Sequence, residues 1–285
     1  MNGPLSFPDF DPVALDLGII VIRWYALAFI AGLLAGWGYI LWLLRRPPMT
    51  MTRQQVGDFF SWAIVGVIVG GRLGFVGFYQ PGYFLENPSQ ILAVWNGGMS
   101  FHGGLLGIVA ATFFYARRYQ INVLSLADLV AAAAPIGLFF GRLANFINGE
   151  LYGRVTDVPW AFVFPTGGEL GRHPSQLYEA GLEGLLLFVI LFALARFAHG
   201  RDRPGLIAGV FLVGYGAARS YVELFRQPDT YVGDGGFLLG NITMGQILSA
   251  PIIIAGIVFI VYAARHERLE HKPSREHGTT RSSGN

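Results

Sequence analysis

Seven long apolar segments constrain this chain more than any other feature of its sequence. A helix that crosses the hydrocarbon part of a bilayer needs about 20 mostly apolar residues. The segments are Ile19–Leu44, Val56–Phe78, Gly104–Ala116 with its flanks, Ala127–Ile147, Glu179–Ala198, Gly205–Phe225 and Gly245–Ala264. Only 13% of the 285 residues are charged and 53% are apolar, whereas an average soluble domain carries about 25% charged residues. The sequence therefore predicts an all-α polytopic membrane protein with seven transmembrane helices.

A single membrane domain accounts for almost the whole chain. Within residues 1–264, neither an internal repeat nor a change in composition suggests a second domain. Residues 1–18 contain three aspartates and no cationic start, so we expect no secretory signal peptide, and the first span serves as the membrane-entry signal. Residues 265–285 are polar, charged and rich in Ser and Thr. This composition predicts a disordered, basic tail.

The basic residues predict the orientation of the chain in the membrane. Thirteen of the twenty Lys and Arg residues lie in the first, third and fifth connections and in the tail. The other side of the predicted membrane has only Arg154, Arg172 and Arg226. Because Lys and Arg are enriched in cytoplasmic loops, the N-terminus is predicted to be periplasmic and the C-terminus cytoplasmic.

The remaining four basic residues fall within the predicted spans. An Arg at the bilayer centre costs about 2.5–3.5 kcal/mol on insertion scales, so such residues usually mark functional sites. The predicted topology puts them in the outer half of the membrane together with several other polar groups. The set comprises Arg23, Arg72, Arg142, Arg219, Tyr25, His102, Glu179, Glu183 and Glu223. This convergence predicts a polar cavity that opens toward the outer leaflet.

The pattern excludes two common classes of charged membrane protein. A voltage sensor carries several arginines at three-residue spacing on one helix, and no segment of this chain does. A proton relay needs acidic groups through the full depth of the membrane, whereas in the cytoplasmic half the predicted spans carry acidic residues only next to their ends.

The sixth span carries a polar stripe. Tyr215, Arg219 and Glu223 recur every four residues and share one helix face, which Arg226 extends. One alternative is that Arg219 and Glu223 only neutralise each other. Glu179 and Glu183 repeat the same spacing, and for these two we favour a structural pairing with an Arg of another helix.

The segment from Gly141 to Gly153 is the densest polar cluster. Arg142 and Asn145 share a helix face, and Asn148 and Glu150 follow within about one turn. The planar guanidinium of Arg matches a phosphate group, and Asn supplies both a donor and an acceptor. The weaker alternative to a binding site is a structural role, in which Arg142 extends toward water and the Asn side chains join neighbouring helices.

Four glycines surround His102 in the stretch from Trp95 to Gly104. Glycine permits an irregular backbone and the close approach of a ligand, and His transfers protons near neutral pH. A structural, hydrogen-bonded His is the alternative. Ser100 lies nearby, but no third member completes a serine triad.

Other features narrow the chemistry and the packing. The chain has no Cys, and it lacks a Walker A motif, an HExxH motif or a carboxylate–His cluster with ligand spacing, so we expect no metal, nucleotide or other cofactor. Pairs of glycines four residues apart predict tight helix crossings. They are Gly32 with Gly36, Gly66 with Gly70, and Gly70 with Gly74.

These motifs together resemble the bacterial prolipoprotein diacylglyceryl transferases along nearly the whole chain. The segment from Gly141 to Gly153 is similar to the signature of that family. Further matching stretches are Arg23–Tyr25, Gly70–Arg72, Gly97–Gly104, Arg172–Glu179 and Glu223–Asp229.

The resemblance implies a seven-helix enzyme of the bacterial inner membrane with its active site in the periplasmic half. Such enzymes move the diacylglyceryl group of phosphatidylglycerol to the thiol of a lipobox cysteine in prolipoproteins and release glycerol phosphate. The residues tied to activity in the family match Tyr25, His102, Arg142, Asn145, Gly153 and Arg219. Glu150, Tyr215 and Glu223 match supporting members. The expected partners are therefore phosphatidylglycerol, prolipoprotein signal peptides and the bilayer, with no nucleic acid.

The implied chemistry agrees with the polar residues. A thiol with an ordinary pKa of about 8.5 needs help to ionise, and the departing phosphate needs cations. We assign Arg142 and Arg219 to the phosphate, with Arg72 as a further lipid-binding candidate. His102 is the candidate that assists the thiol, and Tyr25 and Asn145 orient headgroup oxygens.

The alternatives to a transferase are a transporter of an anionic lipid or solute and a non-catalytic scaffold. Transport predicts access from both sides and repeat symmetry, which the sequence lacks.

Overall fold

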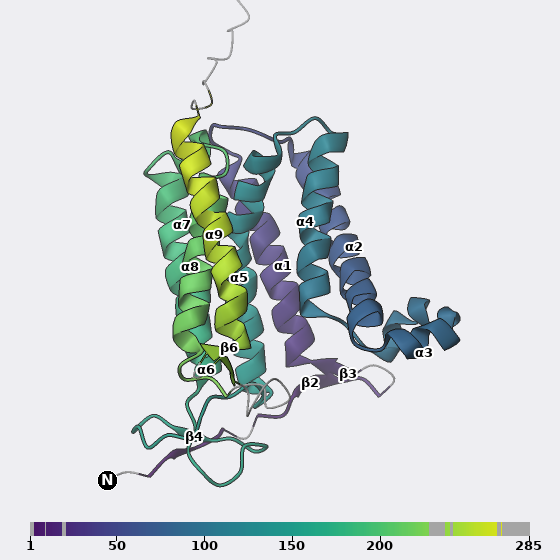
Figure 1. The fold of residues 1–285 in the computed structure, drawn as a ribbon, viewed down its shortest axis with the longest axis vertical. Helices are drawn as coiled ribbons and strands as arrows, with labels where there is room; N and C mark the ends of the chain where they lie inside the picture. The colour runs from purple at the N-terminus through teal and green to yellow at the C-terminus, as the bar shows by residue number, and fades with distance from the viewer. Residues whose placement is uncertain are drawn as a thin grey trace, which may run out of the picture.

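A bundle of long helices makes up most of the molecule (Figure 1). The computed structural model describes residues 3–8, 10–18, 21–227, 237–239, 242–266 and 269. Each of the seven predicted segments coincides with helical structure. The long helices are α1 (Trp24–Leu43), α2 (Arg53–Phe78), α4 (Phe101–Arg118), α5 (Val123–Ile147), α6 with its extension through α7 (Ser175–Glu179, Ala180–Leu186 and Leu187–Arg196), α8 (Leu206–Val222) and α9 (Met244–Arg265).

Five of these segments are long and apolar enough to cross a membrane: α1, α2, α5, Ser175–Arg196 and α9. Helix α8 is apolar but has only 17 residues, and α4 carries Arg117 and Arg118 in its last turn. The fold is therefore that of a mostly helical, polytopic membrane protein.

The helices run alternately up and down through the bundle, so that its two ends differ (Figure 1). Helix α2 packs on α4, α8 packs on α9, and α5 contacts α1, α8 and the segment that precedes α7. The connections 44–52, 119–122 and 197–205 lie at the end where α9 finishes, which we call the basic end. The described residues of 3–8, 10–18 and 21–23 and the segments 79–100 and 148–174 gather at the opposite end.

Glycines set the close crossing of α2 and α4. A Cβ on Gly70 would meet the carbonyl oxygen of Gly103 and the Cα of Gly107, and a Cβ on Gly107 would overlap the carbonyl oxygen of Gly66. A Cβ on Gly74 would lie 2.7 Å from the Cα of Gly103. The predicted close crossing is confirmed, and it depends on glycine on both helices.

The first and third predicted spans differ from the helices in the structure. The prediction that the first span starts at Ile19 and contains Arg23 is wrong, because Arg23 lies on β3 (Val21–Arg23), which pairs with β2 (Val13–Asp16); Ile19 itself lies outside the described residues. The third helix, α4, begins at Phe101, within the flank that precedes the predicted apolar segment Gly104–Ala116. The hydroxyl of Ser100 accepts a hydrogen bond from the amide of Gly103 at 3.2 Å and caps α4, so His102 lies in its first turn.

Short elements complete the end opposite the basic end. Strand β1 (Leu5–Ser6) pairs with β4 (Phe162–Val163), and β5 (Phe237–Leu239) pairs with β6 (Ile242–Thr243). Helix α3 (Pro81–Glu86) and the 3-10 turns Pro88–Leu92 and Val94–Asn96 connect α2 to α4. The 3-10 turn Gly200–Asp202 lies at the basic end. Of the predicted tail, only Arg265, His266 and Leu269 belong to the described residues.

Candidate functional site

Three arginines from two parts of the chain meet at one buried carboxylate, that of Glu179. The Arg142 Nη1 lies 3.2 Å from Glu179 Oε2. Arg219 Nη1 and Arg226 Nη1 lie 2.9 and 3.3 Å from Glu179 Oε1. Helix α5 supplies Arg142, and α8 with the residues that follow it supplies Arg219 and Arg226. Glu179 therefore joins the helices through charge as well as through packing.

Two further glutamates complete this group. Glu183 Oε2 lies 3.5 Å from Arg142 Nη2, and Glu223 Oε2 lies 2.8 Å from Arg219 Nη2. The structure thus contains the ion pair between Arg219 and Glu223 that the sequence analysis gave as an alternative. It also contains the pairing of Glu179 and Glu183 with an arginine of another helix, which the sequence analysis favoured. We call Arg142, Arg219, Arg226, Glu179, Glu183 and Glu223 the arginine–glutamate group.

The arginine–glutamate group has a fully buried part and a partly exposed part. The side chains of Glu179 and Glu183 are 0% exposed, whereas those of Arg142, Arg219 and Arg226 are 15–16% exposed. The carboxylates contact the guanidinium groups from the buried side, and each arginine side chain keeps about 15% of its surface exposed. Such a surface suits an anion with several oxygens, because a guanidinium donates along two edges.

A stretch of π-helix shapes the buried side of the group. Residues Ala180–Leu186 form this stretch between α6 and α7, with Glu179 at its N-cap and Glu183 within it. Insertions of π-helix into α-helices are rare and frequently occur at functional sites. Here the π-helix places two glutamates that are four residues apart against the single arginine Arg142.

Polar side chains at the end of α5 form hydrogen bonds with the residues that directly follow the helix. Asn145 and Asn148 donate from their side-chain nitrogens to Glu150 Oε1, at 2.9 and 3.3 Å. Gly149 allows this turn, since its φ is +65°. Gln176 donates to the backbone carbonyl of Glu150 at 2.7 Å. Asn145 thus lies three residues from Arg142, and its side-chain nitrogen is bound by Glu150. Its side-chain oxygen makes no hydrogen bond within the described chain, so this oxygen is available to a ligand.

Gly153 occupies a position where no side chain fits. A Cβ there would collide with the carbonyl oxygen of Phe225 and with the Cβ and carbonyl oxygen of His173. The amide of Gly153 donates to the His173 carbonyl at 2.8 Å, and its own carbonyl accepts from Arg172 at 3.3 Å. Gly153 therefore fastens the segment after α5 to the residues that precede α6 and packs tightly against Phe225, which follows α8.

Arginine side chains hold the same region together through backbone carbonyls. Arg154 donates to the carbonyls of Arg226 and Glu223 at 2.9 and 3.3 Å. Arg172 donates to Gly167 at 2.8 Å and lies over the ring of Tyr152. These contacts fix the residues that follow α8 and with them the arginine–glutamate group.

His173 lies beside this region but outside the helices. Its Nδ1 lies 3.1 Å from the hydroxyl of Tyr178. Burial lowers the pKa of His173, because the charged imidazolium loses hydration there. The lowered pKa favours the neutral form of His173.

Tyr215 belongs to the neighbourhood of the arginine–glutamate group. It interacts electrostatically with Arg142, Arg219 and Glu183, and its ring stacks on Phe211 with a centroid distance of 5.9 Å. Its place on α8, one turn before Arg219, agrees with the stripe predicted from the four-residue spacing.

Arg72 has a different set of partners. Its five N–H groups make five hydrogen bonds of 2.5–3.2 Å to backbone carbonyls of Gln90, Ile91, Ala93, Gly97 and Gly98. The guanidinium also lies 5.1 Å from the ring centroid of Phe84. All the donors of Arg72 thus hold the connection between α2 and α4, and the side chain orders the backbone ahead of His102.

Tyr25 and His102 lie apart from the arginine–glutamate group. Both side chains are exposed, Tyr25 in the first turn of α1 and His102 in the first turn of α4. The ring of His102 packs edge-on against Phe101. Within the described chain, no hydrogen bond or ion pair joins either side chain to Arg142 or Arg219.

Sequence reasoning undervalued Glu179, Arg226 and the carbonyl contacts of Arg72. The four-residue spacing of Glu179 and Glu183 was a usable signal for an interhelical pairing. This spacing could not show that three arginines share one carboxylate.

Among the described residues, no group of three His, Asp or Glu side chains is arranged to hold a metal ion.

Comparison with known proteins adds an independent finding. Residues 12–262 match the family described as prolipoprotein diacylglyceryl transferase. A protein of Paramagnetospirillum magneticum named phosphatidylglycerol–prolipoprotein diacylglyceryl transferase is 55% identical over 266 residues, which cover 93% of this chain and 98% of the relative. Proteins of the same name from Rhodospirillum rubrum and Rhodospirillum centenum are 55% and 54% identical over 93% and 92% of this chain, and 96% and 95% of their own lengths.

Proposed function

The chain belongs to the prolipoprotein diacylglyceryl transferase family, and on this premise we propose that its arginine–glutamate group binds the phosphate of phosphatidylglycerol. The enzyme transfers the diacylglyceryl group of phosphatidylglycerol to the lipobox cysteine of a prolipoprotein, a step of lipoprotein maturation. This activity decides against the transporter and scaffold alternatives. The convergence of Arg142, Arg219 and Arg226 on one buried carboxylate, with each arginine side chain partly exposed, is the observation that carries the assignment of the site.

The reaction defines what the site must do. The sulfur of the cysteine bonds to the glycerol carbon that carries the phosphate, and the bond from this carbon to the phosphate oxygen breaks. Glycerol phosphate leaves with the bonding electrons, so that negative charge increases on the phosphate while the thiol gives up its proton. Cations placed beforehand at the phosphate stabilise the transition state more than the ground state.

The buried glutamates suit this task because they orient the arginines without facing the ligand. Glu179 and Glu183 fix Arg142 through both of its Nη atoms. Glu179 and Glu223 do the same for Arg219. Both guanidinium groups are then held in place before the lipid arrives, and less conformational entropy is lost when it binds.

His102 remains the proposed proton acceptor for the thiol. It is exposed in the first turn of α4, and its ring nitrogens have no hydrogen-bond partner within the described chain. Asn145 and Tyr25 are proposed to orient headgroup oxygens, and Glu150 supports Asn145 through the 2.9 Å hydrogen bond. For Arg72 we replace the lipid-binding role with a positioning role, because its five donors already bind backbone carbonyls.

The proposed setting is the inner membrane, crossed seven times, with the arginine–glutamate group in the periplasmic half. The concentration of Arg residues at the basic end supports a cytoplasmic location for that end. The site lies toward the other end, near the finish of α5 and α8. A site in this half would be reached by phosphatidylglycerol from the outer leaflet and by signal peptides from the periplasmic side.

A direct transfer assay tests the proposed site. Purified protein is incubated with a lipobox peptide and phosphatidylglycerol, or with phosphatidylcholine of the same acyl chains. We expect the peptide to gain the mass of one diacylglyceryl group and glycerol phosphate to appear only with phosphatidylglycerol, with or without EDTA. Loss of activity with EDTA that a divalent ion restores would contradict the metal-free site.

A further inference from the structure

The connection between α2 and α4, residues 79–100, exposes many large apolar side chains. We call this segment the arm; it includes helix α3 and the 3-10 turns that follow it. Leu85, Leu92 and Trp95 are 83%, 78% and 79% exposed. A concentration of exposed apolar side chains indicates a surface that contacts a membrane or a partner. The other large exposed side chains of the arm belong to Tyr79, Tyr83, Val94 and Met99.

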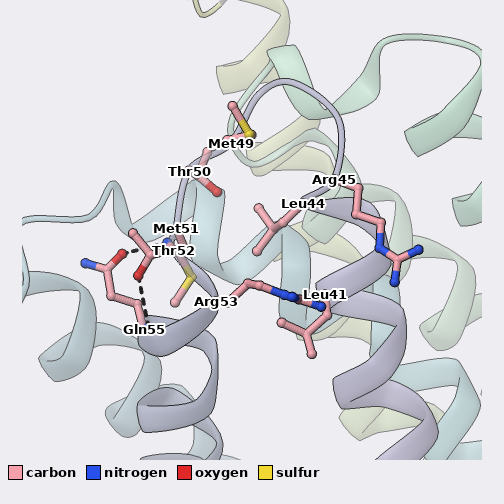
Figure 2. Close-up of a pocket in the computed structure, with 9 residues that line it drawn as sticks. All are labelled: Leu41, Leu44, Arg45, Met49, Thr50, Met51, Thr52, Arg53 and Gln55. Carbon is pink, nitrogen blue, oxygen red and sulfur yellow. Dashed lines mark hydrogen bonds between the residues drawn. The ribbon is translucent and has the colours of Figure 1, made fainter.

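The arm carries little charge compared with other connections of the chain. Glu86 is the one charged residue in its sequence, whereas segment 148–174 contains five charged residues. At the basic end, Figure 2 shows Arg45 and Arg53 near the two ends of the connection between α1 and α2. Connections that enter water thus keep their charges, and the composition of the arm indicates a different environment.

The arm lies beside the bundle, near the level where the helices end. In Figure 1, α3 projects sideways from the end of α2, whereas β4 and the segment around it lie further out along the helix axes. Helix α2 is long and apolar enough to cross a membrane. Val65, Val69 and Leu73 form an exposed apolar face on it, and Phe78 at its end is exposed as well. A surface that faces lipid therefore leads directly to the arm.

The protein itself supplies hydrogen bonds to the irregular backbone of the arm. Arg72 is buried and donates to five carbonyl groups of the arm. The amides of Asn87, Gln90 and Ala93 donate to carbonyls three or four residues earlier. In water an irregular backbone can bond to solvent, whereas in a membrane it needs partners within the protein. A buried arginine beneath an exposed connection therefore fits an arm that is covered by lipid.

We propose that the arm lies in the membrane, at the level of the lipid headgroups, in the leaflet at the end opposite the basic end. In the proposed orientation this is the outer leaflet. Tyr79, Tyr83 and Trp95 suit this depth, because their rings are apolar and carry one polar group. A lipid surface is favoured over a protein partner because the exposed face of the spanning helix α2 leads to the arm.

The location of the arm sets the depth of His102. The arm ends at Ser100, the cap of α4, and His102 follows in the first turn of that helix. Contacts of the arm with lipid and with Arg72 hold this turn near the headgroups, where the phosphate of phosphatidylglycerol lies. This consequence rests on the proposed role of His102, whereas the location of the arm does not.

Quenchers carried by lipids measure the depth of the arm. Leu85→Cys and Leu92→Cys each give one site for a fluorophore in proteoliposomes, because the chain has no other Cys. Leu170→Cys is the matched control, since Leu170 is also an exposed leucine at this end but lies in segment 148–174. Spin labels near the headgroups should quench the arm sites several-fold more than the control, and aqueous iodide should do the reverse. Spin labels at the ends of the acyl chains should quench the arm sites less than those near the headgroups.

Charges on the arm should move it out of the membrane. The double variant Leu85→Glu with Leu92→Glu changes two exposed side chains, so the packing of the folded protein is kept. A fluorophore at Trp95→Cys should then be quenched several-fold less by lipid and more by iodide, whereas Leu170→Glu should leave its quenching unchanged.

Three results would overturn the proposal. The first is quenching of the arm sites by iodide as strong as that of Leu170→Cys, which would place the arm in water. The second is protection of the arm sites from both kinds of quencher, which would indicate a protein partner. The third is stronger quenching from the ends of the acyl chains than from the headgroups, or a Trp95→Cys signal that the two glutamates leave unchanged.

Discussion

Individual side chains show how the transferase keeps three arginines together in an apolar setting. Each guanidinium of Arg142 and Arg219 contacts two carboxylates, and Glu179 is shared by both. A buried ion pair is strongly destabilised when one partner is removed, because the other charge is left uncompensated. Glu179 therefore has more influence on this region than any other single acid, since three arginines depend on it.

Replacement of Glu179 by Gln should lower the free energy of unfolding of the enzyme and stop diacylglyceryl transfer. The amide keeps the shape of the carboxylate but not its charge, and we expect a loss of about 3–5 kcal/mol of stability. Thermal or denaturant unfolding in detergent measures this loss. Glu86→Gln, at the exposed end of α3, is the control and should leave both stability and activity unchanged. A Glu179→Gln variant as stable as this control would contradict the role given to Glu179.

His102→Gln should slow transfer in a way that depends on pH. If His102 accepts the thiol proton, the defect shrinks as the pH rises toward the thiol pKa of about 8.5, because more thiolate then forms without help. The Tm should not change, since the side chain is exposed and has no hydrogen-bond partner in the described chain. Rate profiles and melting curves of both proteins provide the measurement. An equal loss at every pH, with a lowered Tm, would make His102 a structural residue.

The polar residues of the transfer site could be recognised from the sequence, but their pairing could not. An Arg within an apolar segment is visible without a structure, and four-residue spacing placed Tyr215 and Arg219 on one face. The contact of Arg142 with Glu179 depends on how α5 packs against α6, about 40 positions later in the chain. Helical periodicity carries no information about such a contact.

Among the elements, the crossing of α2 and α4 is the one that the sequence predicted best. Glycines at four-residue spacing give one smooth helix face, and the structure places Gly103 and Gly107 of α4 against it. The connection between these helices is the opposite case. Its path follows from the five carbonyls that Arg72 binds, and no local pattern indicates which carbonyls those are.

Gly107→Ala tests the close crossing. Its Cβ would overlap the carbonyl oxygen of Gly66, so the helices must separate. We expect a loss of at least about 1–3 kcal/mol, the usual effect of overpacking. Gly57→Ala is the matched control, because Gly57 lies in the partner helix α2 but has open space around its Cβ position. Alanine there should be neutral or stabilising by about 0.5–1 kcal/mol. Equal unfolding midpoints for the two variants would contradict this packing.

The whole molecule separates its charges between its two ends. Arginines that follow or precede helices gather at the basic end, whereas the arginine–glutamate group lies toward the opposite end with the short strands. The alternation of basic and non-basic connections was readable from the sequence. The arrangement of α1 and α5 between the α2–α4 pair and the α8–α9 pair was not (Figure 1).

Single cysteines test the proposed orientation on a clean background, because the chain contains no Cys of its own. Asp157→Cys lies in an exposed position of the connection between α5 and α6, and Arg118→Cys lies at the basic end. A maleimide that does not cross membranes should label only Asp157→Cys when the outer membrane has been opened, and both variants after lysis. Labelling of Arg118→Cys before lysis would reverse the orientation.

The most direct test of the phosphate-binding role is the rate of diacylglyceryl transfer by Arg142→Ala and Arg219→Ala, with Arg117→Ala as the control. Hydrogen bonds to charged groups contribute about 1.5–3 kcal/mol each, so the loss of two should slow transfer at least about 100-fold. Arg142→Lys should restore little activity because Lys lacks the two-edged guanidinium. The mass gain of a lipobox peptide gives the rate. We expect both alanine variants to transfer at least about 100-fold more slowly than the wild type and the control to keep the full rate. Turnover near that of the wild type in both alanine variants would contradict the assignment.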